Sequence, residues 1–220
     1  MQKELKGFAD SLKEALGERL VSVILYGSAA KGSHKDGASD VNVLVVLRVV
    51  SLDDIARVSE LVLKARERRY NPVFWSETEL RRSSDVFPIE YRGILSGYKI
   101  LLGSDVLAEI SVSDQNLRHQ LEFELRAKIL RLRSSWPNLK GDKAALGKTL
   151  ALAGPSFARL LEEAEGLPGF PLPKDAGRAF EECRKLKGTE FRPGLAELEK
   201  LYRDVHHAAE ILAEAVDALD

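Results

Sequence analysis

Apolar residues follow two different periods along the chain, and the change comes near residue 113. Before it, short runs rich in β-branched residues alternate with amphipathic segments, which predicts strands between helices. After it, apolar residues recur at helical spacing over long stretches, which predicts helices. We therefore expect an α+β protein with two domains. A β-sheet packed with helices is predicted over residues 1–108, and an antiparallel helical bundle over residues 109–220.

Local signals refine the N-terminal half. Ser51 and Ser76 are each followed three positions later by an acidic residue, which is typical of helix N-caps. Pro72 favours the first position or an edge position of its strand. The stretch 89–102 is compatible with either a helix or a strand, and both alternatives stay open. Strands are predicted over residues 21–26, 43–47 and 71–77, and helices over residues 2–16 and 51–69.

The C-terminal half consists of long amphipathic segments with short connections, which is typical of antiparallel bundles. Pro137 is expected to end the first helix, and Gly154 with Pro155 to break or kink the second. The apolar stripes of these helices are the candidate surface for a homodimer or for a partner protein. Helices are predicted over residues 113–136, 143–164, 175–186 and 193–219.

The residues with candidate chemistry lie between the first two predicted strands. Gly27 follows the first strand, Gly32 ends a short turn, and Asp40 opens the second strand. Strand alternation places Asp40 and Asn42 on the same face. Backbone amides at the start of a helix attract anions, and hard cations take carboxylate and phosphate oxygens. This segment therefore predicts a site at which a phosphate group and a divalent cation meet.

Two familiar phosphate-binding loops do not fit this segment. A Walker A loop that began at Gly27 would need lysine at the position of Ser33. A dinucleotide-binding fingerprint would need glycine at the position of Ala29. The structural alternative is an ordinary β-turn-α-turn-β unit whose glycines serve only its turns.

The order of these residues, in the segment 21–47, resembles the Gly-Ser, Gly and Asp-x-Asp signature of the nucleotidyltransferase superfamily related to DNA polymerase β. The resemblance implies a nucleotidyltransferase-like domain with a mixed β-sheet over residues 1–108. It further implies that the domain binds a nucleoside triphosphate with Mg²⁺ and transfers a nucleoside monophosphate to an acceptor hydroxyl. Asp40 takes the place of a catalytic, metal-binding aspartate. The implied nucleotide-binding residues are Gly27, Ser28, Lys31, Gly32 and Ser39.

The sequence departs from this signature at Asn42, which stands where the second aspartate is expected. An amide oxygen can coordinate Mg²⁺ but adds no negative charge to offset two divalent ions. Glu77, at the end of the third predicted strand, is the candidate third ligand, and Glu79 and Glu90 are alternatives. All three also fit surface carboxylates. We therefore expect transfer to be weak or lost, and the alternative is a non-catalytic nucleotide-binding or protein-interaction module, such as a toxin–antitoxin partner.

The charge and the cysteine content of the chain mainly exclude certain partners and certain kinds of site. The formal net charge of −1 gives no general case for binding nucleic acid or membranes. No apolar run approaches the ~20 residues of a membrane-spanning helix. Cys183 is the single cysteine, which excludes an internal disulfide and agrees with a reducing compartment, so a cytoplasmic location is expected.

Two further clusters fit either a functional or a plain structural role. Five arginines near the end of the helix predicted over 51–69 suit a phosphate-bearing ligand, but cations are also favoured at helix C-termini for dipole reasons. His206 and His207 beside Arg203 resemble the Arg and His pair of helical nuclease-like domains, with shorter spacing, and they also fit exposed helix residues. The five arginines are Arg66, Arg68, Arg69, Arg81 and Arg82.

Overall fold

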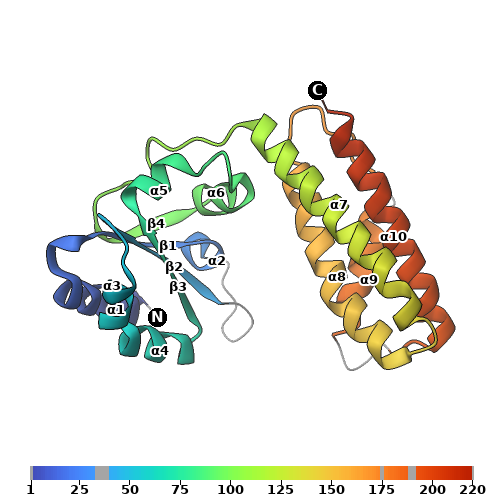
Figure 1. Ribbon diagram of the computed structural model, residues 1–220, viewed down its shortest axis with the longest axis horizontal. Coiled ribbons are helices and arrows are strands. Elements are labelled where there is room, and N and C mark those ends of the chain that lie inside the picture. The colour runs from blue at the N-terminus through green and yellow to red at the C-terminus, as the bar shows by residue number, and fades with distance from the viewer. Residues whose placement is uncertain (1, 33–39, 174–175, 188–191, 220) are drawn as a thin grey trace. The chain divides into compact units, whose positions relative to one another are not determined.

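The computed structural model describes residues 2–32, 40–173, 176–187 and 192–219 (Figure 1). The chain divides into two compact units, Met1–Ser113 and Asp114–Asp220. The first unit contains a mixed sheet with helices, and the second contains helices packed together. The predicted α+β fold class is confirmed.

The sheet of the N-terminal unit has the strand order β3-β2-β1-β4 within the residues described. Strand β1 pairs antiparallel with both β2 and β4, whereas β2 and β3 run parallel. Pro72 lies in the edge strand β3, as predicted, where a missing N–H costs no ladder hydrogen bond on the open side. The strands are β1 Leu20–Tyr26, β2 Val41–Leu47, β3 Tyr70–Ser76 and β4 Tyr98–Gly103.

Alternation along the strands builds a separate core on each face of the sheet. Val43 and Val45 of β2 point into a core shared with α1 and α4. Leu44 and Val46 point into a second core shared with α5 and α6. The helices are α1 Gln2–Leu16, α4 Ser59–Glu67, α5 Glu77–Arg82 and α6 Pro88–Leu95.

The prediction of one helix over 51–69 was wrong. Ser51 does cap a helix by accepting from the N–H of Asp54 at 3.1 Å, but α3 Leu52–Arg57 stops at Val58, and α4 begins after it. Val58 has φ −106° and ψ 8° and is fully buried. No glycine or proline marks this position, so the pattern carries no signal for the break.

The stretch 89–102, left open between helix and strand, contains both. Phe87 precedes α6, and Pro88 occupies its first turn, where the missing N–H costs no hydrogen bond. The helix ends at Leu95, and β4 begins at Tyr98.

The C-terminal unit packs α7, α8, α9 and α10 against one another. Helix α7 continues through Pro137 to Leu139, so the predicted stop at Pro137 was wrong; a proline this close to a helix end removes few backbone bonds. Helix α8 likewise continues through Gly154 and Pro155. None of the helices described is both long and apolar enough to cross a lipid bilayer. The helices are α7 Asp114–Leu139, α8 Lys143–Ala164, α9 Ala176–Lys185 and α10 Leu195–Asp217.

Ser76 begins α5 with a reciprocal capping box. Its Oγ accepts from the N–H of Glu79 at 3.1 Å, and Oε2 of Glu79 accepts from the N–H of Ser76 at 2.8 Å. We expect Ser76→Ala to lower the free energy of unfolding by about 1 kcal/mol, measured by urea denaturation. Ser104→Ala, at an exposed position after β4, is the control and should change it little.

The same box predicts a pH dependence. The backbone and hydroxyl of Ser76 donate to Glu79 and lower the pKa of that carboxyl. The contribution is therefore present above the ordinary pKa of glutamate and is lost as the pH falls through the lower folded value. The difference between the unmodified chain and Ser76→Ala should shrink in acid, and a constant difference would contradict the cap.

Candidate functional site

A tight turn joins β1 to the short helix α2, Ser28–Lys31. Gly27 has φ 76°, a conformation that residues with a side chain rarely adopt. A Cβ at Gly27 would lie 3.3 Å from Nδ2 of Asn42, so the side chain of Asn42 covers the glycine. The absence of a side chain at Gly27 therefore allows both the turn and this close contact.

The loop before β4 holds this turn in place. The N–H of Gly27 donates to the carbonyl of Gly97 at 3.2 Å. The side chain of Lys31 lies along Gly97, because a Cβ there would be 2.7 Å from Cγ of Lys31. Gly32 ends α2 with φ 77°. Lys31 is exposed, and a lysine beside such a turn can act as a point charge for a phosphate group.

Asp40 lies directly before β2 and is paired with an arginine. Nε of Arg69 donates to Oδ1 of Asp40 at 3.0 Å, and the carbonyl of Arg69 accepts from the N–H of Val41 at 2.9 Å. Arg69 has φ 61° and is the one non-glycine with positive φ among the residues described. The side chains of Arg69 and Asp40 are 48% and 58% exposed, so the pair adds little stability but places a cation on the carboxylate.

The strand register adds a residue that sequence reasoning missed. Asn42 is the partner of Tyr26 on β1 and of Asn71 on β3. Because register partners in neighbouring strands point to the same face, Asn42 and Asn71 lie side by side. Asn71 was not predicted as a site residue, because a carboxylate was expected as the third ligand. Its position at the start of that strand was visible in the sequence, but the parallel pairing that brings it to Asn42 was not.

Comparison with known proteins agrees with this geometry. Residues 5–94 match the nucleotidyltransferase domain family. The N-terminal unit is a nucleotidyltransferase-like domain. The segment that matches includes the Gly27 turn and Asp40.

A solved structure resembles the whole chain in fold. It is the crystal structure of spectinomycin adenyltransferase AAD(9) from Enterococcus faecialis with ATP and spectinomycin. The TM-score is 0.55 at 11% sequence identity, and the match covers 94% of this chain and 99% of that one. No curated protein sequence matches this chain. The likeness in fold therefore extends over residues of both units of this chain.

The structure places Glu77 and Glu79 away from this end of the nucleotidyltransferase-like domain. Glu77 follows the far end of β3, where Ser76 pairs with Leu47, and it forms an ion pair with Arg81 at 3.3 Å. Glu79 is occupied by the cap of α5. The register therefore does not bring Glu77 to Asp40. The predicted arginine cluster is divided in the same way, with Arg69 at one end of β3 and Arg81 at the other.

Glu90 of α6 acts on the same end of the sheet as Asn42. Burial raises the pKa of Tyr26, and the negative charge of Glu90 raises it further. Tyr26 is the register partner of Asn42, so Glu90 is electrostatically coupled to a neighbour of the site. Of the three carboxylates singled out in the sequence, Glu90 is the one that the structure associates with this end of the domain.

Besides Glu90, the side chains at this end of the domain that offer oxygen ligands to a cation include one carboxylate and two amides. They belong to Asp40, Asn42 and Asn71. Over residues 2–32, 40–173, 176–187 and 192–219, no group of three or more His, Cys, Asp or Glu side chains is placed to hold a metal ion. Ser28 is the first residue of α2, and Ser39 lies outside the residues described.

Proposed function

We propose that the nucleotidyltransferase-like domain binds a nucleoside triphosphate at the turn formed by residues 27–32. The observation that carries the proposal is the close contact between Gly27 and Asn42, which joins a turn without a side chain to the polar start of β2. The family match supports it, as does the presence of ATP in the crystal structure of the adenyltransferase of similar fold.

Each residue of the turn has a definite part in this proposal. Gly27 lets the backbone approach a phosphate group closely, and the amides at the start of α2 face an anion favourably. Lys31 supplies a positive charge from its exposed position against Gly97. Arg69 supplies a second one beside Asp40. These groups bind a triphosphate and offset its negative charge, and binding of this kind breaks no bond in the triphosphate.

Asp40, Asn42 and Asn71 alone do not balance the charge of a pair of Mg²⁺ ions. Two such ions bring four positive charges, whereas Asp40 brings one negative charge and already carries the guanidinium of Arg69. The amides of Asn42 and Asn71 add oxygen ligands but no charge. We therefore propose that the domain descends from enzymes that transfer a nucleoside monophosphate to a hydroxyl, and that this transfer is weak or lost here.

Thermal stability measured with each of the four nucleoside triphosphates, with and without Mg²⁺, tests the binding proposal. A ligand that binds the folded chain raises its apparent stability, so we expect a rise in Tm with at least one triphosphate. Lys31→Ala should reduce this rise. Lys6→Ala, which removes an exposed lysine of α1, is the matched control and should not. The absence of a rise with every triphosphate would overturn the proposal.

Incubation with each labelled triphosphate, Mg²⁺ or Mn²⁺, and cell extract tests the loss of transfer. We expect no label transfer above background. Strong transfer that requires Asp40 would show that the remaining donors suffice, and strong transfer that survives Asp40→Ala would place the chemistry at another site.

A further inference from the structure

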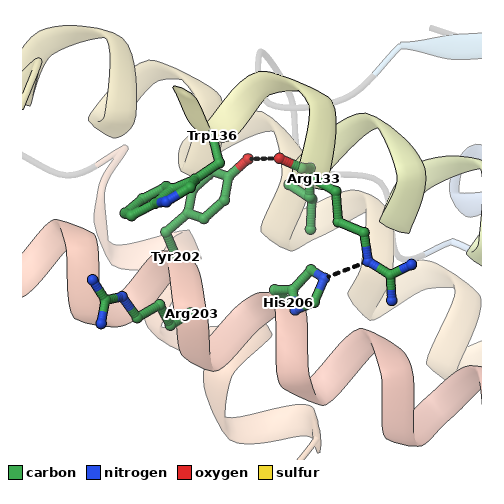
Figure 2. A pocket seen from close by; sticks show the side chains of 6 residues that line it. Arg133, Trp136, Tyr202, Arg203 and His206 are labelled. Atoms are coloured by element: carbon green, nitrogen blue, oxygen red, sulfur yellow. Dashed lines mark hydrogen bonds between the residues drawn. The ribbon is translucent and has the colours of Figure 1, made fainter. Parts of the chain in front are cut away.

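The helical unit contains a pocket that the proposed nucleotide site does not involve. It lies between α7 and α10, which pack along each other (Figure 2), and its volume is about 270 Å³. Its lining combines apolar and aromatic side chains with basic ones: Leu132, Arg133, Trp136, Tyr202, Arg203 and His206.

Two aromatic rings form the apolar part of the pocket. Tyr202 is buried, and its hydroxyl donates to the carbonyl of Leu132 at 2.6 Å, which fixes the ring across the two helices (Figure 2). The ring of Trp136 packs on Tyr202 with centroids 5.0 Å apart and planes tilted by 31°. Both rings are therefore held in place before any ligand arrives, which lowers the entropic cost of binding one.

Two guanidinium groups form the rim of the pocket. That of Arg203 lies 5.5 Å from the centroid of the Trp136 ring. Among the residues described, no carboxylate forms an ion pair with Arg203, whereas Arg133 pairs with Glu210 at 2.6 Å. The rim therefore carries more positive than negative charge. The cation of Arg203 is available to a ligand at no loss of an existing ion pair.

His206 connects the two sides of the pocket. Nε of Arg133 donates to Nε2 of His206 at 3.1 Å, and because arginine only donates, Nε2 must accept (Figure 2). The remaining nitrogen, Nδ1, lies 3.4 Å from Oε2 of Glu210. The prediction that both histidines are exposed holds for His207, at 74%, but His206 is 26% exposed and lines the pocket.

We propose that this pocket binds one planar ring that carries one anionic group, of the size and class of a nucleoside monophosphate. The partly exposed ring of Trp136, held against Tyr202, supplies apolar and stacking surface for a base. Arg203 supplies a charge-assisted contact for the phosphate. A purely apolar ligand would make no use of the guanidinium of Arg203. The ligand is either a free mononucleotide or one nucleotide of a single strand, since both present this chemistry.

The chain has two tryptophans, so Trp75→Phe leaves Trp136 as the sole indole reporter. We expect AMP to change the fluorescence of Trp136 in this variant with saturation, and both adenosine and inorganic phosphate to bind at least about tenfold more weakly. Where Trp75→Phe does not fold, the indole N–H signals of the ¹⁵N-labelled unmodified chain follow the same titration. Hexameric oligo(rA) binding more tightly than AMP would identify a single strand as the source of the ligand, and the reverse order would identify a free mononucleotide.

Variants of Arg203, at the rim of the pocket, test whether AMP binds in this pocket. Arg203→Ala should weaken AMP binding by about tenfold or more, and Arg203→Lys, which keeps the charge, should weaken it less. Arg159→Ala removes an exposed arginine of α8 that lines none of the pockets described, and it should leave AMP binding unchanged. Equal binding of AMP and adenosine, no saturable response of Trp136, or no effect of Arg203→Ala would each overturn the proposal.

Discussion

Asn42→Asp is expected to raise the affinity of the chain for Mg²⁺ by about tenfold or more, because a second carboxylate adds a charged hard ligand beside Asp40. Asp40 already forms an ion pair with Arg69, so an aspartate at position 42 would add negative charge that this arginine does not offset. The two side chains are nearly isosteric, and folding should change little. Calorimetric titration with Mg²⁺, with and without ATP, measures the change.

Two further variants sharpen this test. Asn71→Asp, combined with Asn42→Asp, places a third carboxylate at the register partner and should raise the affinity again. Asn138→Asp makes the same change in charge at an exposed position of α7 and should leave the affinity for Mg²⁺ unchanged. An unchanged affinity in Asn42→Asp would mean that this side chain does not face the cation.

Gly154→Ala is expected to destabilise the helical unit by about 3 kcal/mol, at the upper end of typical overpacking costs. Gly154 lies in α8 against α9: a Cβ at Gly154 would overlap Cβ of Cys183 and would lie 3.1 Å from the carbonyl oxygen of Phe180. Neither of these atoms is the flexible end of a long side chain, so relief requires the helices to separate. Thermal and urea unfolding followed by circular dichroism measure the loss.

The control for this variant is another glycine of the same helix. A Cβ at Gly147 has no neighbour closer than 3.9 Å, so Gly147→Ala should be neutral or stabilising, as alanine favours a helix by up to about 1 kcal/mol over glycine. Cys183→Gly removes the atom that Gly154→Ala would strike, and the double variant should be more stable than the sum of the two single effects. Equal stability of the Gly154→Ala and Gly147→Ala variants would contradict the packing described.

The elements that the sequence predicts well are those whose pattern is local. The strand that leads to Gly27, the capped helix after Ser76 and the bundle helices depend on nearby residues, and the structure contains all of them. The break at Val58 was missed because burial in the core decides it. The course of α7 through Pro137 was missed because a proline in a last turn is tolerated.

The sequence predicts the Gly27 turn of the candidate site, but it does not predict which residues lie around that turn. The Gly27 turn follows from the conformational freedom of glycine, and strand alternation is the basis for expecting Asp40 and Asn42 on one face. The contact of Arg69 with Asp40 depends on a positive φ at a non-glycine residue, for which the sequence has no marker. The position of Asn71 depends on a strand register, which requires knowing the strand order.

That strand order has a consequence for how the chain is made. Strand β1 lies inside the sheet, but its partner β4 is separated from it by the rest of the N-terminal unit, and the hydroxyl of Ser22 bonds to the carbonyl of Leu102 across 80 positions. During synthesis, β1 remains an open edge with unpaired N–H and C=O groups until residues 98–103 have emerged. A nascent chain that stalls before this point exposes an apolar strand edge to other chains.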